Sequence, residues 1–218
     1  MNRIIITGAS GFLGKKFVEY MLDKNIEVVA VVRNKNKLSD ISSDLLKVIE
    51  LDIKDVSKLI EVAHLMDISD IYNTDAFYHF AWEGTSGSLR EDYEVQLNNV
   101  KLTCDVVRVA YELGCKKFIN AGSLMEYESM KLMETREEKP VGNYLYRSAK
   151  LSAHYMAKAE AGRLGIPFIN MIISNVYGEG EVSNRFICST LKKIINDEDI
   201  AFTSGEQMYD FIHIGETL

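Results

Sequence analysis

The sequence is poor in cysteine, and its few thiols lie far apart. The three cysteines, Cys104, Cys115 and Cys188, are odd in number and form no C-x-x-C pair. This pattern argues against a disulfide framework and against a zinc site, and reduced thiols in a cytosol fit it better. The four histidines show no ligand spacing either, so we assign no metal.

Long apolar runs and an excess of positive charge are also missing. No stretch reaches the roughly 18 uninterrupted apolar residues of a membrane span, and the first apolar run is too short for a signal peptide. We therefore expect a soluble, cytoplasmic protein with no membrane partner. With 25 Lys and Arg against 32 Asp and Glu, the formal net charge is −7, which argues against nucleic acid as a main partner.

What the sequence does contain is an alternation of strand-like and helix-like segments. The predicted strands are 3–7, 27–32, 46–51, 76–82, 117–121 and 167–174, and the predicted helices are 12–22, 57–66, 89–113 and 144–164. Strands separated by helices of this length predict an α/β fold, a doubly wound parallel sheet with helices on both faces. The long polar connection 126–143 is expected to be either a functional lid or a disordered loop.

A glycine-rich turn joins the first predicted strand to the first predicted helix. Gly8, Gly11 and Gly14 have the spacing G-x-x-G-x-x-G. Such a turn lets backbone N–H groups approach a pyrophosphate, whose charge is favoured at a helix N-terminus. As a variant of G-x-G-x-x-G the spacing alone is a weak signal, and the alternative is a tight turn that binds nothing. Because a strand precedes it and a helix follows, we interpret it as a dinucleotide-binding turn.

The end of the second predicted strand bears on which nicotinamide cofactor is used. NAD-binding domains commonly place Asp or Glu there to hold the ribose hydroxyls. Here the segment V-V-R-N-K contains no acid. Arg33 is suited to pair with a 2′-phosphate, so NADP(H) is favoured, with NAD as the other possibility. The alternative is a solvated basic loop.

A tyrosine and a lysine lie one helical turn apart in the last predicted helix. Tyr146 and Lys150 have the spacing i, i+4, which places them on one face. An unassisted tyrosine ionises near pH 10, too high for efficient proton exchange at neutrality, and a neighbouring ammonium favours its phenolate. The same pair also occurs on many exposed helix faces, so alone it is a weak signal.

Two further side chains follow strands at the same predicted sheet edge. Ser123 follows the fifth strand, where its hydroxyl either donates to a substrate oxygen or only makes a turn. Trp82 closes the fourth strand, where its ring either shapes a substrate pocket or only packs against other side chains. Both positions fit the rule that ligands bind beyond the carboxyl ends of parallel strands.

In their order along the chain, these motifs resemble the extended short-chain dehydrogenase/reductase superfamily, in its NAD-dependent epimerase/dehydratase branch. The similarity covers essentially the whole chain. The matching segments are Thr7–Gly14, Asp52-Ile53, His79–Trp82, Asn99 with Thr103, Gly122–Tyr127, Tyr146 with Lys150, Asn175–Gly178 and Tyr209–Ile214.

The resemblance implies a role for each matching residue. Tyr146 would be the acid/base, Lys150 would bind the nicotinamide ribose and tune the tyrosine, and Ser123 would polarise the substrate oxygen. The expected cofactor-binding residues are Thr7, Gly8, Ser10, Gly11, Phe12, Leu13, Gly14, Arg33, Asp52, Ile53, Ala81, Asn99, Tyr146 and Lys150. The expected substrate-binding residues are Trp82, Ser123 and Asn175. Relatives also lead us to expect a homodimer, formed through 89–113 and the helix of Tyr146.

Departures from the family pattern narrow the expected reaction. Leu124 and Met125 stand where enzymes that eliminate water from C4–C6 carry Asp-Glu, so a 4,6-dehydratase is disfavoured. Ile172 and Tyr209 replace two usual arginines, which affects how a substrate is held. Family members are also usually longer, so we expect a Rossmann domain at 1–174 and, at 175–218, the start of an incomplete substrate-binding region.

The sequence therefore predicts an NAD(P)-dependent oxidoreductase acting on a nucleotide-activated sugar. Hydride transfer would occur at C4, in an epimerase or a 4-keto reductase, with Tyr146 as acid/base. The alternative is a non-catalytic NAD(P)-binding sensor or interaction module, which would not need Ser123, Tyr146 and Lys150 together.

Overall fold

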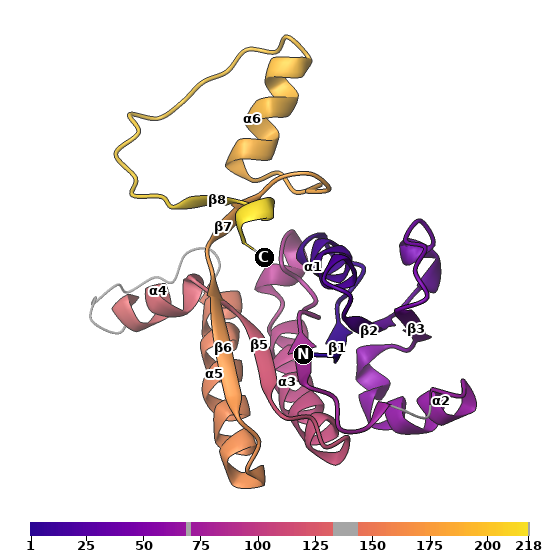
Figure 1. Cartoon of the computed structure of the whole chain (residues 1–218). Helices are drawn as coiled ribbons and strands as arrows, with labels where there is room; N and C mark the ends of the chain where they lie inside the picture. The colour runs from indigo at the N-terminus through magenta and orange to yellow at the C-terminus, as the bar shows by residue number, and fades with distance from the viewer. Residues whose placement is uncertain (69–70, 133–143, 218) are drawn as a thin grey trace. The chain divides into compact units, whose positions relative to one another are not determined.

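The chain divides into two compact units, Met1–Ile172 and Ile173–Leu218 (Figure 1). The computed structural model describes residues 1–68, 71–132 and 144–217. The larger unit holds the strands β1 (Arg3–Thr7), β2 (Glu27–Val32), β3 (Leu46–Glu50), β4 (Ala76–His79), β5 (Phe118–Ser123) and β6 (Phe168–Ile173, which ends one residue past the boundary). Its helices are α1 (Phe12–Asp23), α2 (Leu59–Leu65), α3 (Tyr93–Glu112), α4 (Met125–Leu132) and α5 (Tyr144–Leu164), with short 3-10 helices at Lys35–Leu38, Ile53–Lys58 and Ser88–Glu91.

Within the described residues, these strands form one six-stranded parallel sheet in the order β3-β2-β1-β4-β5-β6. The order runs outward in opposite directions from β1 and β4, so the winding reverses between these two strands. In doubly wound folds, ligands bind beyond the carboxyl ends of the strands at such a point. The fold class predicted from the sequence is confirmed, and it indicates where a binding site lies.

The register of the sheet aligns the residues that end each strand. Thr7 of β1 pairs with Val31 of β2 on one side and with His79 of β4 on the other, and His79 pairs with Asn120 of β5. The residues that come next therefore leave the sheet at a common edge. They are Gly8 after β1, Arg33 after β2, Ala81 and Trp82 after β4, and Ser123 at the end of β5.

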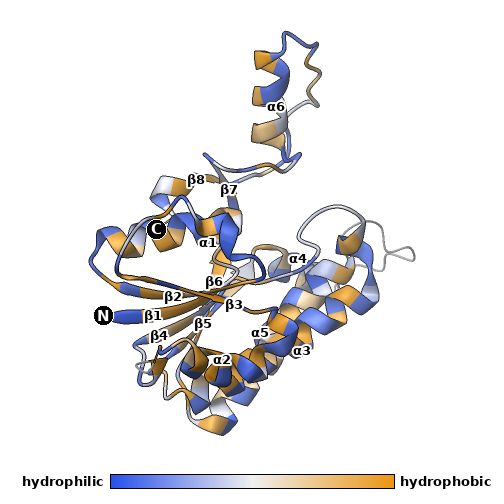
Figure 2. Ribbon diagram, turned by 90° about the vertical axis from the view of Figure 1, so that its right-hand side faces the viewer, coloured by the Kyte–Doolittle hydropathy of each residue, from blue (hydrophilic) through white to orange (hydrophobic). Residues whose placement is uncertain are grey.

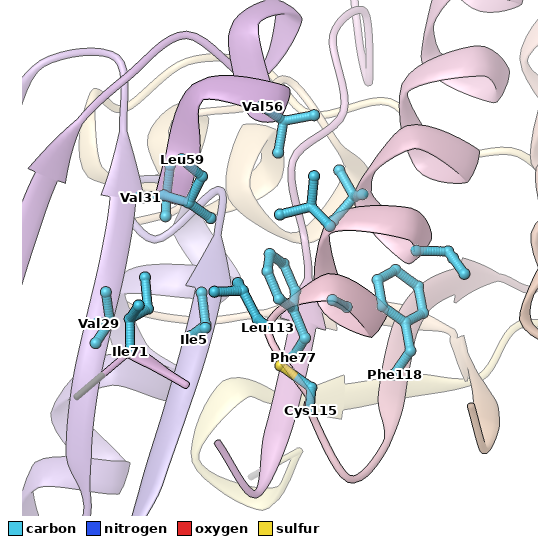
Figure 3. Close-up of a cluster of buried hydrophobic side chains, with 14 of the residues drawn as sticks. Ile5, Val29, Val31, Val56, Leu59, Ile71, Phe77, Leu113, Cys115 and Phe118 are labelled. Atoms are coloured by element: carbon cyan, nitrogen blue, oxygen red, sulfur yellow. The ribbon is translucent and has the colours of Figure 1, made fainter. Parts of the chain in front are cut away.

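The main core lies on the face of the sheet that α2, α3 and α5 cover, whereas α1 covers the opposite face (Figure 2). Figure 3 shows Ile5, Phe77 and Phe118 from neighbouring strands gathered with Leu113 and Cys115. Phe77 and Phe118 are fully buried and stack with ring centroids 5.9 Å apart. Burying an aromatic ring of this size contributes about 2–3 kcal/mol, so the sheet is anchored near the strands that carry the site.

A stripe of small side chains decides how α5 packs. Alanines at every fourth position let the helix lie close against α3 and β5. Tyr146 and Lys150 fall on the same stripe, so the packing that buries the alanines also turns these two polar side chains into the protein. The buried alanines are Ala149, Ala153, Ala157 and Ala161.

The structure corrects the expectation of a continuous loop at 126–143. Met125–Leu132 forms α4, and the rest of that segment lies outside the described residues. Its polar composition masked a helix whose Glu126 and Ser129 are buried. The expected helix 89–113 also begins later, at Tyr93, because the Asp92 side chain accepts hydrogen bonds from the N–H groups of Glu94 and Val95 and caps the helix there.

The smaller unit holds β7 (Asn175–Tyr177), α6 (Phe186–Ile195), β8 (Phe211–His213) and a 3-10 turn at Ile214–Glu216. β7 and β8 pair in parallel, and the Asn175 side chain donates to the Asp210 carbonyl at 3.2 Å. Phe186 of α6 lies near Phe202 and Phe211, with ring centroids 5.8 and 6.0 Å away. In the described ranges of both units, no helix is both long and apolar enough to cross a membrane.

Candidate active site

The glycine turn after β1 is shaped by close backbone contacts. Gly8 has φ +73°, and a Cβ there would lie 2.5 Å from the Ala81 nitrogen. A Cβ at Gly14 would overlap the Gly8 carbonyl oxygen. Both positions therefore require glycine for the turn itself, whatever it binds.

Gly11 is different, because it is exposed and a Cβ there would meet only the Gly8 oxygen, at 3.3 Å, a tight contact that a small shift relieves. Gly11 is the N-cap of α1, offers no side-chain cap, and no acidic residue lies in the first turn of this fully described helix. The N–H groups at the helix start therefore face no competing carboxylate, which suits an anion. Ser10, Phe12 and Leu13 around this turn are partly exposed. The residues present fit a dinucleotide pyrophosphate.

Arg33 leaves β2 as an exposed side chain, 67% accessible, and it has an acidic neighbour that the sequence did not indicate. Glu83 places one carboxylate oxygen 3.9 Å from Arg33 and the other 3.8 Å from Lys54. Asp52 caps the following turn by accepting from the Lys54 N–H at 2.9 Å, and Ile53 packs against the core. A phosphate at Arg33 would therefore compete with a weak, solvent-exposed ion pair.

The segment after β4 is held by two buried amides of α3. Asn99 accepts from the Glu83 N–H at 3.0 Å and donates to the Glu83 carbonyl at 2.8 Å. Gln96 accepts from the indole N–H of Trp82 at 3.1 Å and donates to the Leu89 carbonyl at 2.9 Å. These contacts fix Ala81 and Trp82 beside the glycine turn, and Gln96 is a supporting residue that sequence reasoning missed.

A buried histidine lies beneath the site. His79 at the end of β4 shares hydrogen bonds with the hydroxyls of Thr7 at 2.8 Å and Thr103 at 3.3 Å. Burial, with a smaller contribution from the positive charge of Lys150, lowers the pKa of His79 to about 3. The imidazole is therefore a neutral link between β1, β4 and α3 rather than a proton carrier near pH 7.

Lys150 is the centre of the site. It is 5% exposed, and its ammonium donates to the Ala121 carbonyl of β5 at 2.9 Å. The same nitrogen lies 3.7 Å from the centre of the Trp82 ring and 6.0 Å from the centre of the Tyr146 ring. Trp82 and Tyr146 meet edge to face with centroids 6.0 Å apart. The structure thus brings Trp82, which comes from another part of the sequence, against the Tyr146 and Lys150 pair of α5.

Two charged residues of opposite sign influence Lys150. Burial lowers the pKa of Lys150 to about 7, the charge of Glu126 opposes this shift, and the charge of Arg90 adds to it. Arg90 also lies over Tyr146, its guanidinium carbon 3.7 Å from the ring centre. No sequence signal pointed to Arg90, because its contact with Tyr146 joins segments far apart in the chain.

Ser123 ends β5 with its hydroxyl turned toward the next helix. Its Oγ accepts from the Met125 N–H at 3.2 Å, and the Glu126 carboxylate accepts from the Ser123 N–H at 2.8 Å. This reciprocal pair is a variant of the capping box in which the serine accepts from the N–H of Met125 instead of Glu126, and its S-x-x-E signature is present in the sequence at 123–126. That signature would have predicted α4. Asn175, the third expected substrate residue, belongs to the smaller unit.

The sheet order, the glycine turn at the winding reversal and the side chains beyond the strand ends define a protein of the Rossmann class. The chain belongs to the NAD dependent epimerase/dehydratase family, whose family model matches residues 4–217. The resemblance seen in the sequence motifs is thereby confirmed.

Curated relatives are enzymes of nucleotide-sugar metabolism. CDP-abequose synthase of Salmonella typhimurium is 25% identical over 226 residues, covering 99% of this chain and 67% of the relative. The dTDP-4-dehydro-6-deoxyglucose reductase of Escherichia coli is 25% identical, covering 99% of this chain and 70% of the relative. The chain spans about two thirds of the length of these enzymes.

Solved structures share the fold at lower identity. The Bordetella bronchiseptica enzyme WbmG, in complex with NAD, has a TM-score of 0.74 at 18% identity and is covered over 66% of its chain. The UDP-N-acetylglucosamine 4-epimerase of Methanobrevibacter ruminantium has a TM-score of 0.76 at 22% identity and is covered over 70%. At this identity the likeness concerns the fold alone.

Proposed function

We propose that this protein is an NAD(P)-dependent oxidoreductase that acts at C4 of a nucleotide-activated sugar, as an epimerase or a 4-keto reductase. One observation carries the proposal: the buried Lys150 ammonium lies beside Tyr146 and Trp82 at the carboxyl edge of the sheet. A buried cation is costly, and a structural role does not require one at this place. Family membership and the two nucleotide-sugar relatives support the substrate class.

The chain's own residues would divide the proton chemistry among them. Tyr146, as phenolate, would take the proton of the C4 hydroxyl during oxidation and return it to the carbonyl oxygen during reduction. Lys150, as ammonium, favours that phenolate. Ser123 would donate a hydrogen bond to the same sugar oxygen as its charge develops. Bound NAD(P) supplies or accepts the hydride.

Other residues would hold the cofactor. We assign the pyrophosphate to the turn at Thr7–Gly14, the adenine to Asp52 and Ile53, and the ribose of the nicotinamide to Lys150. Ala81 would lie along the cofactor, and Asn99 would support it through the segment after β4. Arg33 favours NADP(H), because it ends β2 where an acid would otherwise hold the ribose hydroxyls. NAD is the other possibility.

The proposal is tested by assaying CDP-, dTDP-, UDP- and GDP-sugars, including 4-keto forms, with NADH and NADPH. Consumption of NADPH with a 4-keto sugar identifies a reductase, and tightly retained NAD⁺ with no net redox change identifies an epimerase. Tyr146→Phe should abolish turnover while leaving cofactor binding intact. Full turnover in this variant would overturn the mechanism, and cofactor binding without turnover of any sugar would favour the non-catalytic alternative.

A homodimer is part of the same proposal, since relatives lead us to expect one through α3 and α5. Apolar side chains on both helices support it, because they are exposed in the single chain. They are Tyr93, Leu97 and Tyr111 on α3, and Tyr155 and Met156 on α5. Light scattering after size-exclusion chromatography decides this: wild type should have the mass of two chains and Leu97→Glu the mass of one.

A further inference from the structure

A buried glutamate connects the proposed catalytic residues to a histidine of α5. Glu126 is 3% exposed. Its Oε1 accepts from the Ser123 N–H at 2.8 Å, and its Oε2 lies 2.8 Å from Nδ1 of His154. Asn170 of β6 donates to Oε2 at 3.1 Å. None of these contacts is needed for the hydride and proton steps described above.

Helix capping explains only half of this arrangement. A capping box needs one carboxylate oxygen, and an exposed glutamate serves equally well. In this protein the second oxygen is also buried, and burying a charged group costs several kcal/mol unless partners compensate it. The partners form a chain across two strands, because Asn170 in turn accepts from the Asn120 amide at 2.7 Å. The carboxylate is therefore built into the interior beside Ser123.

Lys150 is the cation that benefits from this carboxylate. Burial and the charge of Arg90 both lower the pKa of Lys150, and Glu126 is the group that raises it. The Lys150 hydrogen bond to Ala121 and the Glu126 hydrogen bond to Ser123 are made to positions two residues apart on β5. One strand end thus carries both contacts.

The charged and titratable groups around Glu126 come from each element packed against it. α5 contributes His154 and Lys158 beside Glu126 and Lys150 within reach of its charge, while Arg90 of the turn before α3 acts on Lys150. Polar groups come from Ser123 and Asn120 of β5 and from Asn170 of β6. A pocket of about 370 Å³ is lined by Glu126, His154, Lys158 and the rings of Tyr127, Tyr155 and Phe168.

We propose that Glu126 is a positioning residue whose negative charge keeps Lys150 in the ammonium form and whose Oε1 holds the backbone of Ser123 in place. The effect of Glu126 on turnover rests on the proposed function. The effect of its charge on the protonation of Lys150 involves only side chains of this chain, so it can be measured in the protein without substrate. His154 and Asn170 hold the second oxygen so that the charge stays beside the site.

The test compares Lys150 in the wild type and in Glu126→Gln. Glutamine has the same length and retains an acceptor for the Ser123 N–H, so the capping box survives while the charge is lost. The Cε signal of Lys150 in ¹³C-lysine-labelled protein, assigned with Lys150→Arg, is followed by NMR against pH. We expect its titration midpoint to fall by about one pH unit in Glu126→Gln. An unchanged midpoint would overturn the inference.

Glu128→Gln is the matched control, because Glu128 lies on the same helix and pairs with Arg147 at 2.9 Å. This variant loses the same charge and should leave the Lys150 midpoint at its wild-type value; an equal fall in both variants would also overturn the inference. Glu126→Asp keeps the charge and shortens the reach to Ser123. Should Glu126→Gln fail to fold, Glu126→Met removes the charge in its place, and a Lys150 midpoint equal to that of Glu126→Asp would overturn the inference.

Activity gives an independent readout. Since the reaction would require the ammonium form, the falling limb of the kcat profile should move to lower pH in Glu126→Gln and stay in place in Glu128→Gln. If no sugar is turned over, the proposed function fails and the NMR comparison still decides the role of Glu126. If turnover is found and the Lys150 midpoint does not move, only the role of Glu126 fails.

Discussion

The ammonium of Lys150 lies 3.7 Å from the centre of the Trp82 ring. Lys150 comes from α5 and Trp82 from the segment after β4, so the contact joins two elements that lie far apart in the sequence. A cation over an indole face is attracted to it, most strongly where water is excluded. This cation–π contact links the protonation of Lys150 to the only tryptophan of the chain.

Trp82 should therefore report the ionisation of Lys150. With the pKa of Lys150 lowered to about 7 by burial, the Trp82 emission should titrate with a midpoint near neutrality. The titration should vanish in Lys150→Met and persist in Lys158→Met, because Lys158 lines the pocket beside His154 instead. Emission spectra recorded between pH 5.5 and pH 9, a range about one and a half to two units either side of that midpoint, check this. An unaltered titration in Lys150→Met would show that another group is responsible.

Removing the Lys150 charge should stabilise the fold. The pKa of Lys150 falls from 10.5 to about 7, so between these values the unfolded chain binds a proton that the folded protein does not. Stability from this group therefore rises with pH across the window, and below it the buried cation opposes folding. Lys150→Met should raise the free energy of unfolding at pH 7 by about 1–3 kcal/mol, after the loss of the hydrogen bond to Ala121.

Urea denaturation at several pH values measures this effect. The advantage of Lys150→Met over the wild type should shrink as the pH rises from 7 toward 10. A variant that is less stable than the wild type at pH 6 would contradict the argument. The expected gain in stability would accompany a loss of turnover, which is the pattern of a residue retained for function.

The glycines of the turn should separate into two classes. Gly14→Ala should destabilise the protein by more than about 2 kcal/mol, because its Cβ would overlap backbone that cannot move aside. Gly11→Ala should fold at a smaller cost of about 1 kcal/mol, since its Cβ would lie 3.3 Å from the Gly8 oxygen and that backbone need shift only slightly, yet should weaken NADPH binding. Denaturation and calorimetric titration distinguish the two. Equal cofactor affinity in Gly11→Ala and wild type would remove the turn from the binding site.

His79 should make the fold sensitive to acid. Burial lowers its pKa to about 3, well below the value of 6.5 expected for the unfolded chain. Between these values the unfolded state binds the extra proton, so stability present above pH 6.5 is lost as the pH falls toward 3. At pH 4.5 the loss from this residue amounts to roughly 2–3 kcal/mol.

His79→Gln keeps a polar side chain between Thr7 and Thr103 without the titrating ring. Its free energy of unfolding should change less between pH 7 and pH 4.5 than that of the wild type, by roughly 2 kcal/mol. His64→Gln, which alters a histidine outside the core, is the control and should retain the wild-type dependence. Parallel curves for His79→Gln and wild type would contradict the assignment.

Features of the fold and the site could be predicted where they depend on residues close together in the sequence, and not where they depend on contacts between distant segments. The glycine turn and the spacing of Tyr146 and Lys150 are short-range patterns, and the alternation of strands and helices predicts the sheet from local runs. The contact of Arg90 with Tyr146 joins residues 56 positions apart along the printed numbering and has no local pattern. Burial of Lys150 was equally hidden, because lysine is rarely buried and only the alanine stripe of α5 turns it inward. The capping box at Ser123–Glu126 was local and was overlooked in a polar stretch.

The preference for NADPH over NADH should change when either Arg33 or its ion-pair partner Glu83 is replaced. Arg33 favours NADPH in the proposal, and Glu83 lies 3.9 Å from it and 3.8 Å from Lys54. Arg33→Ala should weaken NADPH binding about tenfold and leave NADH nearly unchanged, because only the 2′-phosphate needs the guanidinium. Glu83→Gln frees both cations and should tighten NADPH binding by about two- to fivefold, a size typical of exposed pairs.

The backbone of Glu83 should keep its place in this variant, since Asn99 holds its N–H and carbonyl rather than its carboxylate. Glu61→Gln on α2 makes the same charge change away from Arg33 and should leave both affinities as they are. Titration of each variant with NADPH and NADH at low and high salt measures the ratio of affinities, and salt should reduce the effect of Glu83→Gln. If the ratio is the same in all three variants as in the wild type, Arg33 does not select the cofactor.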